Sequence, residues 1–222
     1  MIKIAHFSDH HIRNFERHEE YKKSQEVFYA SLKISKPDFI IFTGDLVHNK
    51  NRISPELVKM CSEFLKNLSN IAPLIMILGN HDQNLSNQSR LDAITPILNA
   101  MNNENIFCYK KSGIYPLTRF IDLVVFSCFE SDLNWPTKEQ IDNNKINIGL
   151  YHGTLQGAKF QNGMIVKAED CPYNAKKFLD IVDYLMLGDI HKLQSIGSVV
   201  YEYIEVDEEN IQQYLDNGWK FC

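Results

Sequence analysis

Long hydrophobic runs are absent from this sequence of 222 residues. The longest apolar stretches, residues 37–42 and 72–78, are far shorter than the roughly 20 residues that a helix needs to cross a bilayer. Residues 1–9 likewise lack the apolar core and the small-residue cleavage site of a secretion signal. We therefore expect a protein that neither spans a membrane nor is secreted, and that works in the cytoplasm.

Cysteine pairs of the CxxC type are also absent, and so are internal repeats, low-complexity segments and linkers. An odd number of scattered cysteines favours reduced, packed thiols in a cytosolic protein. A hydrophobic content of 44% and a charged content of 23% are typical of a globular chain, and the length predicts a single domain, residues 1–222. The five cysteines are Cys61, Cys108, Cys128, Cys171 and Cys222.

The chain has no excess of positive charge, since 23 basic residues face 28 acidic ones. Residues 202–222 hold six acids and one base, which accounts for the whole net charge of −5 and leaves the preceding residues neutral. This balance argues against non-specific electrostatic binding to nucleic acid. Local basic clusters still leave specific binding open. They are Arg13, Arg17, Lys22 and Lys23; Lys50 and Arg52; Lys110 and Lys111; and Lys176 and Lys177.

Strands and helices alternate in the first half of the sequence. Near-continuous apolar runs predict three buried strands, and the helical spacing of apolar residues over about 17–33 predicts a helix after the first. Ser54 followed by Pro55 is typical of the start of a second helix. This order predicts a parallel sheet covered on both faces, and the shorter apolar runs beyond about residue 105 predict a second sheet stacked on it. The three strands are residues 2–7, 38–42 and 73–78.

Side chains that bind metals follow five of the predicted strands. Ligand sites in open α/β sheets gather beyond the carboxyl ends of the strands, so we expect these side chains at one rim. Their mixture of carboxylate, amide and imidazole suits Mn²⁺, Fe or Zn²⁺ better than Ca²⁺. Each of the short motifs taken alone is more often an ordinary turn. All five together are not explained by ordinary turns. The exits are Asp9-His10-His11, Gly44-Asp45, Gly79-Asn80-His81-Asp82, His152-Gly153 and Gly188-Asp189-Ile190-His191.

In this order, the segments FSDHH, FTGDL, LGNHD, YHG and LGDIH resemble the five motifs of the calcineurin-like metallophosphoesterases, usually DxH, GD, GNHD or GNHE, H and GHxH. The resemblance covers roughly residues 1–195, and GNHD carries most of its specificity. It implies an α/β fold, the four-layer α/β/β/α sandwich of the metallophosphoesterase type. It also implies a centre of two divalent metal ions, commonly Mn²⁺ in nucleases of this kind.

Carried over residue by residue, the resemblance implies a role for each ligand. Two cations about 3.5–4 Å apart would clamp the phosphate oxygens and lower the pKa of a bridging water. The implied ligands are Asp9, His11 and His191 for metal one, Asp45 as the bridge, and Asn80, His152 and Asp189 for metal two.

Three further residues would act on the substrate rather than on the metals. His81 would protonate or stabilise the leaving oxygen, and Asp82 would orient the His81 imidazole. His48, three residues after Asp45, stands where the DNA-repair nuclease branch carries a histidine that positions the scissile phosphate. The other interpretation of His48 is an exposed or supporting side chain. The remaining histidines of the first helix region and strand are expected to be structural or on the surface. They are His6, His10 and His18.

Residues 13–28, 44–50 and 79–98 resemble the SbcD-like nucleases and their phage relatives. This branch implies a Mn²⁺-dependent exo- or endonuclease that acts on DNA in repair or phage recombination, in a bacterial or phage-infected cell. It also implies an SMC-like, SbcC-like ATPase as partner.

The sequence departs from that branch in two places. Position 189 is Asp where the superfamily usually has His, which adds negative charge and can alter the metal preference. Residues 196–222 form a short acidic tail in place of the family's DNA-capping and ATPase-docking regions. The tail is either a partner-docking segment or a solvated last strand and helix. The sequence therefore does not decide whether the protein binds an ATPase partner or forms a homodimer.

Two alternatives remain beside the nuclease. One is a phosphodiesterase or phosphatase that acts on a small molecule or a cyclic nucleotide, because superfamily membership does not name a substrate. The other is a catalytically idle binding or scaffold module, which Asp189 and the missing C-terminal regions bring into consideration.

Overall fold

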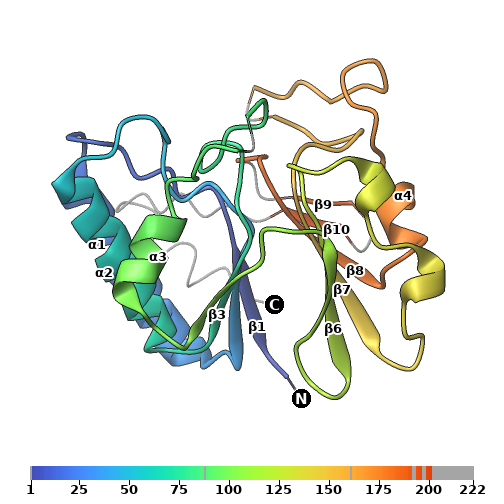
Figure 1. The fold of residues 1–222 in the computed structure, drawn as a ribbon, viewed down its shortest axis with the longest axis horizontal. Helices are drawn as coiled ribbons and strands as arrows, with labels where there is room; N and C mark the ends of the chain where they lie inside the picture. Colours follow the sequence, from blue (N-terminus) through green and yellow to red (C-terminus); the bar gives the residue numbers. More distant parts are fainter. Residues whose placement is uncertain (1, 88, 161, 192–193, 197–198, 202–222) are drawn as a thin grey trace.

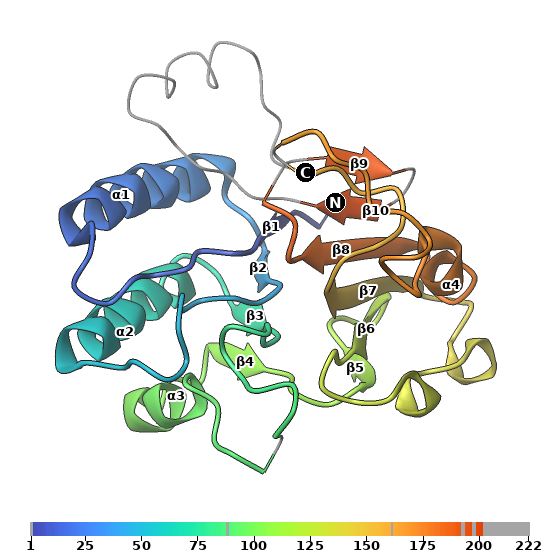
Figure 2. The same cartoon turned by 90° about the horizontal axis from the view of Figure 1, so that it is seen from above.

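Two β-sheets pack face to face, and helices cover their outer faces (Figures 1 and 2). The computed structural model describes residues 2–87, 89–160, 162–191, 194–196 and 199–201. The layer order is helices, sheet, sheet, helix, so the predicted four-layer α/β/β/α arrangement is confirmed. Within the described residues, each helix is too short or too polar to cross a membrane.

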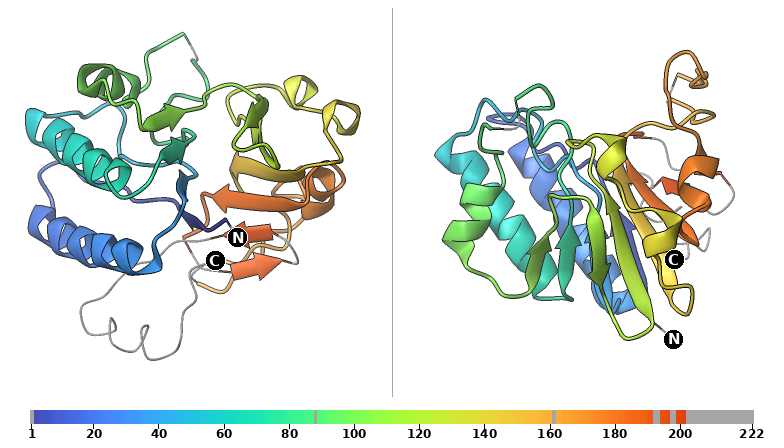
Figure 3. Two further views of the ribbon diagram at one scale, coloured as in Figure 1. Left: turned by 90° about the horizontal axis from the view of Figure 1, so that it is seen from below. Right: turned by 45° about the vertical axis from the view of Figure 1, so that its right-hand side comes forward.

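The first sheet consists of four parallel strands in the order β1-β2-β3-β4. Helices α1, α2 and α3 lie on its outer face, away from the second sheet (Figure 3). As predicted, Ser54 caps α2: its side chain accepts from the Leu57 amide at 3.3 Å, and Pro55 is the first helical residue. The elements are β1 (Ile4–Phe7), α1 (His18–Ser35), β2 (Phe39–Phe42), α2 (Pro55–Ser69), β3 (Leu74–Met76), α3 (Thr95–Met101) and β4 (Ile106–Cys108).

The second sheet is mixed, with strand order β5-β6-β7-β8-β10-β9. Strands β6, β7, β8 and β10 run parallel, and β5 and β9 pair antiparallel at the two edges. The elements are β5 (Gly113–Pro116), β6 (Ile121–Phe126), η1 (Asp132–Asn134), η2 (Lys138–Gln140), β7 (Ile146–His152), α4 (Ala175–Leu179), β8 (Tyr184–Gly188), β9 (Gln194–Ile196) and β10 (Val199–Tyr201).

Alternation along the strands builds three apolar layers. In β2, Ile41 faces the second sheet while Ile40 and Phe42 face the helices, because successive strand residues point to opposite faces. The layer between the sheets is apolar on both sides. Its buried members are Ile41, Ile75, Ile77, Ile121, Leu123, Val125, Ile148 and Leu150.

The strands that carry the candidate ligands end at one rim, at the top of Figure 1. Parallel pairing within each sheet brings the ends of β1, β2 and β3 together, and likewise those of β7 and β8. Several contacts join the sheets at this rim. Among them, His152 Nδ1 donates to the Thr43 carbonyl at 2.7 Å, and the Asp189 amide donates to the Asp9 carboxylate at 3.0 Å. The rim is therefore shared by both sheets.

Candidate metal centre

Tight left-handed turns place the candidate ligands directly after their strands. Asp9, His11, Asp45 and Asp189 have φ values of 57°, 49°, 64° and 86°. Non-glycine residues rarely adopt this conformation, and Asp and His do so more readily than most. Such strain gathers at functional sites, where the surrounding structure holds it in place. Here it turns each side chain inward as soon as its strand ends.

Two glycines leave room for the ligands to approach one another. A Cβ atom on Gly79 would lie 2.1 Å from Asp45 Oδ1, and one on Gly188 would lie 2.4 Å from the Thr43 carbonyl oxygen. Both contacts are shorter than side chains tolerate, so the close packing at this rim requires glycine.

Asp9, His11 and His191 form the first group of ligand atoms. The Nε2 atoms of His11 and His191 lie 2.9 Å apart, and each is 3.7 Å from Asp9 Oδ1. One atom from each residue lies within 4.8 Å of the others, although His11 and His191 are 180 positions apart in the chain. The structure thus brings together the three residues expected to hold metal one.

Asp9, Asp45 and His152 form a second group, which shares Asp9 with the first. His152 Nε2 lies 3.4 Å from Asp45 Oδ2 and 2.9 Å from Asn80 Oδ1. Because Nδ1 of His152 donates to the Thr43 carbonyl, Nε2 is the nitrogen turned toward the centre. Asp45 also lies 3.6 Å from His11 Nε2, so it stands between the two groups, as a bridging ligand must.

Asp189 lies at the edge of the second group. Its Oδ1 is 4.0 Å from His152 Nε2, and its Oδ2 accepts a hydrogen bond from the Thr154 hydroxyl. The Asp189 side chain is 31% exposed, whereas those of Asp9 and Asp45 are almost fully buried. It is thus the most solvent-accessible of these three carboxylates.

The electrostatics of the centre favour cations. Burial, opposed by the nearby His152, raises the pKa of Asp9 to about 7. Burial alone would lower the pKa of His152, but the carboxylates of Asp45, Asp9 and Asp189 together outweigh it and raise that pKa to about 10. Buried carboxylates are costly unless cations or hydrogen bonds compensate them, and the ion-pair partners of Asp9 and Asp45 here are imidazoles. The donor set therefore fits two divalent ions.

Comparison with protein families matches residues 2–193 to the one described as calcineurin-like phosphoesterase. The chain belongs to this family. The predicted resemblance is confirmed, and the family supports a hydrolase that acts on phosphoester bonds.

Among curated relatives, the chain is 43% identical over 204 residues to uncharacterized protein R555 of Acanthamoeba polyphaga mimivirus, covering 86% of this chain and 15% of that protein. It is 24% identical to the SbcD component of the SbcCD nuclease of Staphylococcus epidermidis, covering 97% of this chain and 66% of that protein. The SbcD component of Staphylococcus saprophyticus is 27% identical, with coverages of 91% and 60%. The chain thus spans less than two thirds of the length of these relatives.

Two solved structures also match. Pseudomonas putida nuclease MPE matches with a TM-score of 0.39 and 12% identity, over 73% of this chain and 66% of that one. The Escherichia coli phosphoesterase YfcE matches with a TM-score of 0.39 and 17% identity, over 74% and 76%.

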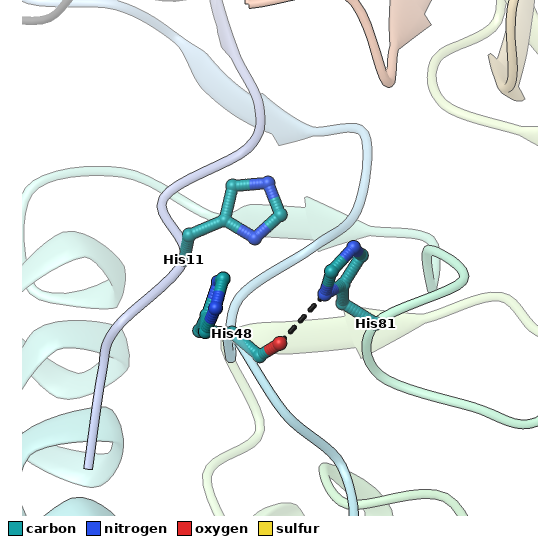
Figure 4. Close-up of side chains that lie close together, drawn as sticks. All are labelled: His11, His48 and His81. Atoms are coloured by element: carbon teal, nitrogen blue, oxygen red, sulfur yellow. Dashed lines mark hydrogen bonds between the residues drawn. The ribbon is translucent and has the colours of Figure 1, made fainter.

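In this calcineurin-like phosphoesterase, His48 and His81 stand beside the first ligand group. Their ring centroids lie 5.8 Å and 4.7 Å from that of His11 (Figure 4). His81 Nδ1 donates to the main-chain carbonyl of His48 at 2.6 Å, and the His81 amide donates to Asp45 Oδ1 at 2.8 Å. Both rings therefore lie next to His11 of the first ligand group.

Asp82 does not orient the His81 imidazole, contrary to the expectation from sequence. Its fully buried carboxylate accepts from the amides of Asp45, Val47 and Gly79 at 2.8, 3.1 and 3.0 Å. The ring of His81 is held by the His48 carbonyl instead. Asp82 therefore acts on the backbone of the loop that carries Asp45, because its carboxylate turns toward the amides that this loop leaves unpaired.

Sequence reasoning missed the polar residues that hold the ligands. The Ser8 hydroxyl donates to Asp9, Thr154 donates to Asp189, and Thr43 supplies the carbonyl that accepts from His152. The Lys50 ammonium donates to the main-chain carbonyl of Asn80. Ser8, Thr43 and Thr154 each lie within two residues of a motif ligand. Hydroxyl residues next to the motifs are therefore a sequence signal that could have identified them.

The other histidines at the start of the chain are structural, as expected. His10 is stacked on Phe64 with ring centroids 4.3 Å apart, and its Nε2 lies 2.8 Å from Gln25 Nε2. His6 is buried and bonds through Nε2 to the Thr43 hydroxyl at 2.9 Å. His18 bonds to the main-chain carbonyl of Arg13.

Proposed function

We propose that this protein is a metal-dependent nuclease that hydrolyses phosphodiester bonds of DNA with two Mn²⁺ ions. The observation that carries the proposal is a pair of ligand groups that share Asp9, with Asp45 between them and the rings of His48 and His81 alongside. The names of two relatives, each the SbcD component of an SbcCD nuclease, support DNA as the substrate.

The bound ions would clamp the phosphate oxygens, stabilise the charge of the transition state and lower the pKa of a water between them. Asp9, His11 and His191 would hold one ion; Asn80, His152 and Asp189 the other; Asp45 would bridge. Carboxylate and amide oxygens among these ligands suit Mn²⁺, and the carboxylate at position 189 strengthens that preference over Zn²⁺.

The chain's own contribution to proton transfer rests on His81. Because its Nδ1 donates to the His48 carbonyl, a doubly protonated His81 would give its second proton from Nε2 to the leaving oxygen. His48 stands next to this ring, where its imidazole would steady the scissile phosphate. The Ser8 hydroxyl and the Asp189 amide hold the Asp9 carboxylate in one orientation while this happens.

The setting of the reaction is part of the proposal. We place the protein in the cytoplasm of a bacterium or a phage-infected cell, where it would act in DNA repair or recombination. An SbcC-like ATPase is the partner that the names of the relatives favour. The acidic segment 202–222, for which partner docking is one of the two interpretations, lies outside the described residues.

The test uses the full chain, stripped of metal and reloaded with Mn²⁺. We expect two equivalents of bound metal and cleavage of single- or double-stranded DNA, with little hydrolysis of a cyclic nucleotide or a phosphomonoester. Hydrolysis of the small substrates without DNA cleavage would replace the nuclease by a phosphodiesterase or phosphatase. One equivalent of metal or none, with no turnover on any substrate, would favour an idle binding module.

A further inference from the structure

Three imidazoles gather on the side of the centre that faces the first sheet. His11, His48 and His81 come from the loops after β1, β2 and β3, and one nitrogen of each lies within 4.8 Å of the others (Figure 4). The His11 and His81 rings are nearly perpendicular, with centroids 4.7 Å apart, and the His48 and His81 centroids are 5.6 Å apart. This group has no carboxylate, unlike the two groups that share Asp9.

One of the three rings already has the hydrogen-bond partner that a metal-binding histidine needs on its other nitrogen. His81 donates from Nδ1 to the His48 carbonyl, so its lone pair is on Nε2 when the ring is neutral. His11 has Nε2 at 3.6 Å from Asp45 Oδ2, while its Nδ1 turns toward the other two rings (Figure 4). Among the described residues, this buried Nδ1 has no hydrogen-bond partner.

We propose that His11, His48 and His81 form a third metal site, for an ion of the Zn²⁺ class, whose occupation removes His11 from the dinuclear centre. Three imidazoles without an oxygen ligand suit Zn²⁺, Co²⁺, Ni²⁺ or Cu²⁺ far better than Mn²⁺ or Mg²⁺. The group leaves a fourth position for water, as three-histidine zinc sites do.

His11 cannot bind metal one and the third ion at the same time, because a neutral imidazole has a single nitrogen lone pair. His11 can bind metal one through Nε2, with the proton on Nδ1, or the third ion through Nδ1, with the proton on Nε2. In the second state, the proton on Nε2 faces His191 Nε2 at 2.9 Å and the Asp45 and Asp9 carboxylates at 3.6 and 3.7 Å. A third ion therefore replaces the ligation of metal one by His11 and also occupies the rings of His48 and His81.

Backbone hydrogen bonds join the loops after β1 and β2, which carry His11 and His48. The His11 amide donates to the Asp45 carbonyl at 3.0 Å, and the His48 amide donates to the Ile12 carbonyl at 3.0 Å. Zn–N bonds of 2.0–2.1 Å require ligand nitrogens roughly 3.3 Å apart. Because the three nitrogens lie within 4.8 Å of one another, each pair must close by at most about 1.5 Å. The His48 ring is partly exposed, and we expect it to move toward the other two.

The test must distinguish Zn²⁺ bound at the third site from Zn²⁺ that simply replaces Mn²⁺ in the dinuclear centre. A His48 variant makes this distinction, because His48 belongs to the three-histidine group and to neither carboxylate-containing group. Zn²⁺ is added to the Mn²⁺-loaded full chain, and released Mn²⁺ is followed by electron paramagnetic resonance. In the wild type we expect about one equivalent of Zn²⁺ to release one Mn²⁺. In His48→Gln the same release should need at least about tenfold more Zn²⁺. His18→Gln, a histidine outside the group, is the matched control and should behave as the wild type.

Equal release curves for the wild type and His48→Gln would overturn the proposal. X-ray absorption at the zinc edge gives a second measurement that needs no variant: three imidazoles around Zn²⁺ support the site, and mainly oxygen ligands refute it. Binding of Zn²⁺ to the metal-free chain, measured against a chromophoric chelator, keeps the test independent of the proposed nuclease. A His48-dependent zinc site in a chain that cleaves no DNA would refute the function and leave this inference intact.

Discussion

His81 Nδ1 lies 2.6 Å from the main-chain carbonyl oxygen of His48. A carbonyl oxygen can only accept, so this contact fixes which nitrogen of His81 bears the proton in the neutral ring. His48, whose backbone carbonyl holds the His81 ring, also places its own imidazole beside that ring. The two residues that would act on the substrate are thereby coupled through the backbone of one loop, and a change in that loop affects both.

Replacing His81 with Ala should lower DNA cleavage by about 10²- to 10⁴-fold, the usual contribution of a general acid. The metal content should stay at two equivalents, because His81 belongs to neither carboxylate-containing group. Turnover and metal analysis on the same preparation check this. Undiminished cleavage would remove His81 from the mechanism.

Replacing Asp82 with Ala should destabilise the fold by about 2 kcal/mol or more, because three buried amides lose their acceptor. Asp82→Asn keeps one acceptor oxygen and should be intermediate. Urea unfolding of the three proteins measures the effect. If Asp82 only oriented His81, both variants would lose activity at wild-type stability, in contrast to the expectation here.

Replacing Asp189 with Ala should sharply weaken retention of metal two and DNA cleavage, because a carboxylate turned toward the centre is lost. Asp189→His restores the side chain usual in the superfamily and should keep much of both. The residue has a φ of 86°, which is strained for every residue with a Cβ atom and is tolerated better by Asp and His than by Ala, so the melting temperature serves as a control. Wild-type activity in Asp189→Ala would refute the ligand role.

Acid should destabilise the protein through His10. Burial lowers the pKa of this ring from 6.5 to about 4, so the unfolded chain binds its proton first as the pH falls. The stability from the neutral ring is present above pH 6.5 and is lost progressively toward pH 4. His10→Phe keeps a ring against Phe64 but cannot titrate. Its melting temperature should fall several degrees less than that of the wild type between about pH 7 and pH 4.5; parallel curves would contradict this.

Local sequence patterns were sufficient to predict the fold class and the set of candidate ligands. Strands buried on both faces are near-continuous apolar runs, and parallel strands must deliver their exits to one edge, so the five motifs point to one rim without further information. The start of α2 was equally local, since Ser54 and Pro55 cap and begin a helix through neighbouring backbone atoms. The resemblance to the family followed from the order of the motifs, and the resemblance to the nuclease branch followed from residues 13–28, 44–50 and 79–98.

Only the tertiary structure decided which polar atoms at the rim bond to each other. Asp82 and His81 are adjacent in sequence, which made an interaction between them the natural expectation, yet the carboxylate bonds to the amides of Asp45 and Val47, 37 and 35 positions away. The meeting of His11 with His191 likewise depends on the packing of the two sheets, and that of His11 with His48 and His81 depends on the pairing of β1, β2 and β3 within the first sheet. The sequence by itself determined which side chains reach the rim; which atoms face each other there depends on through-space distances that no local pattern encodes.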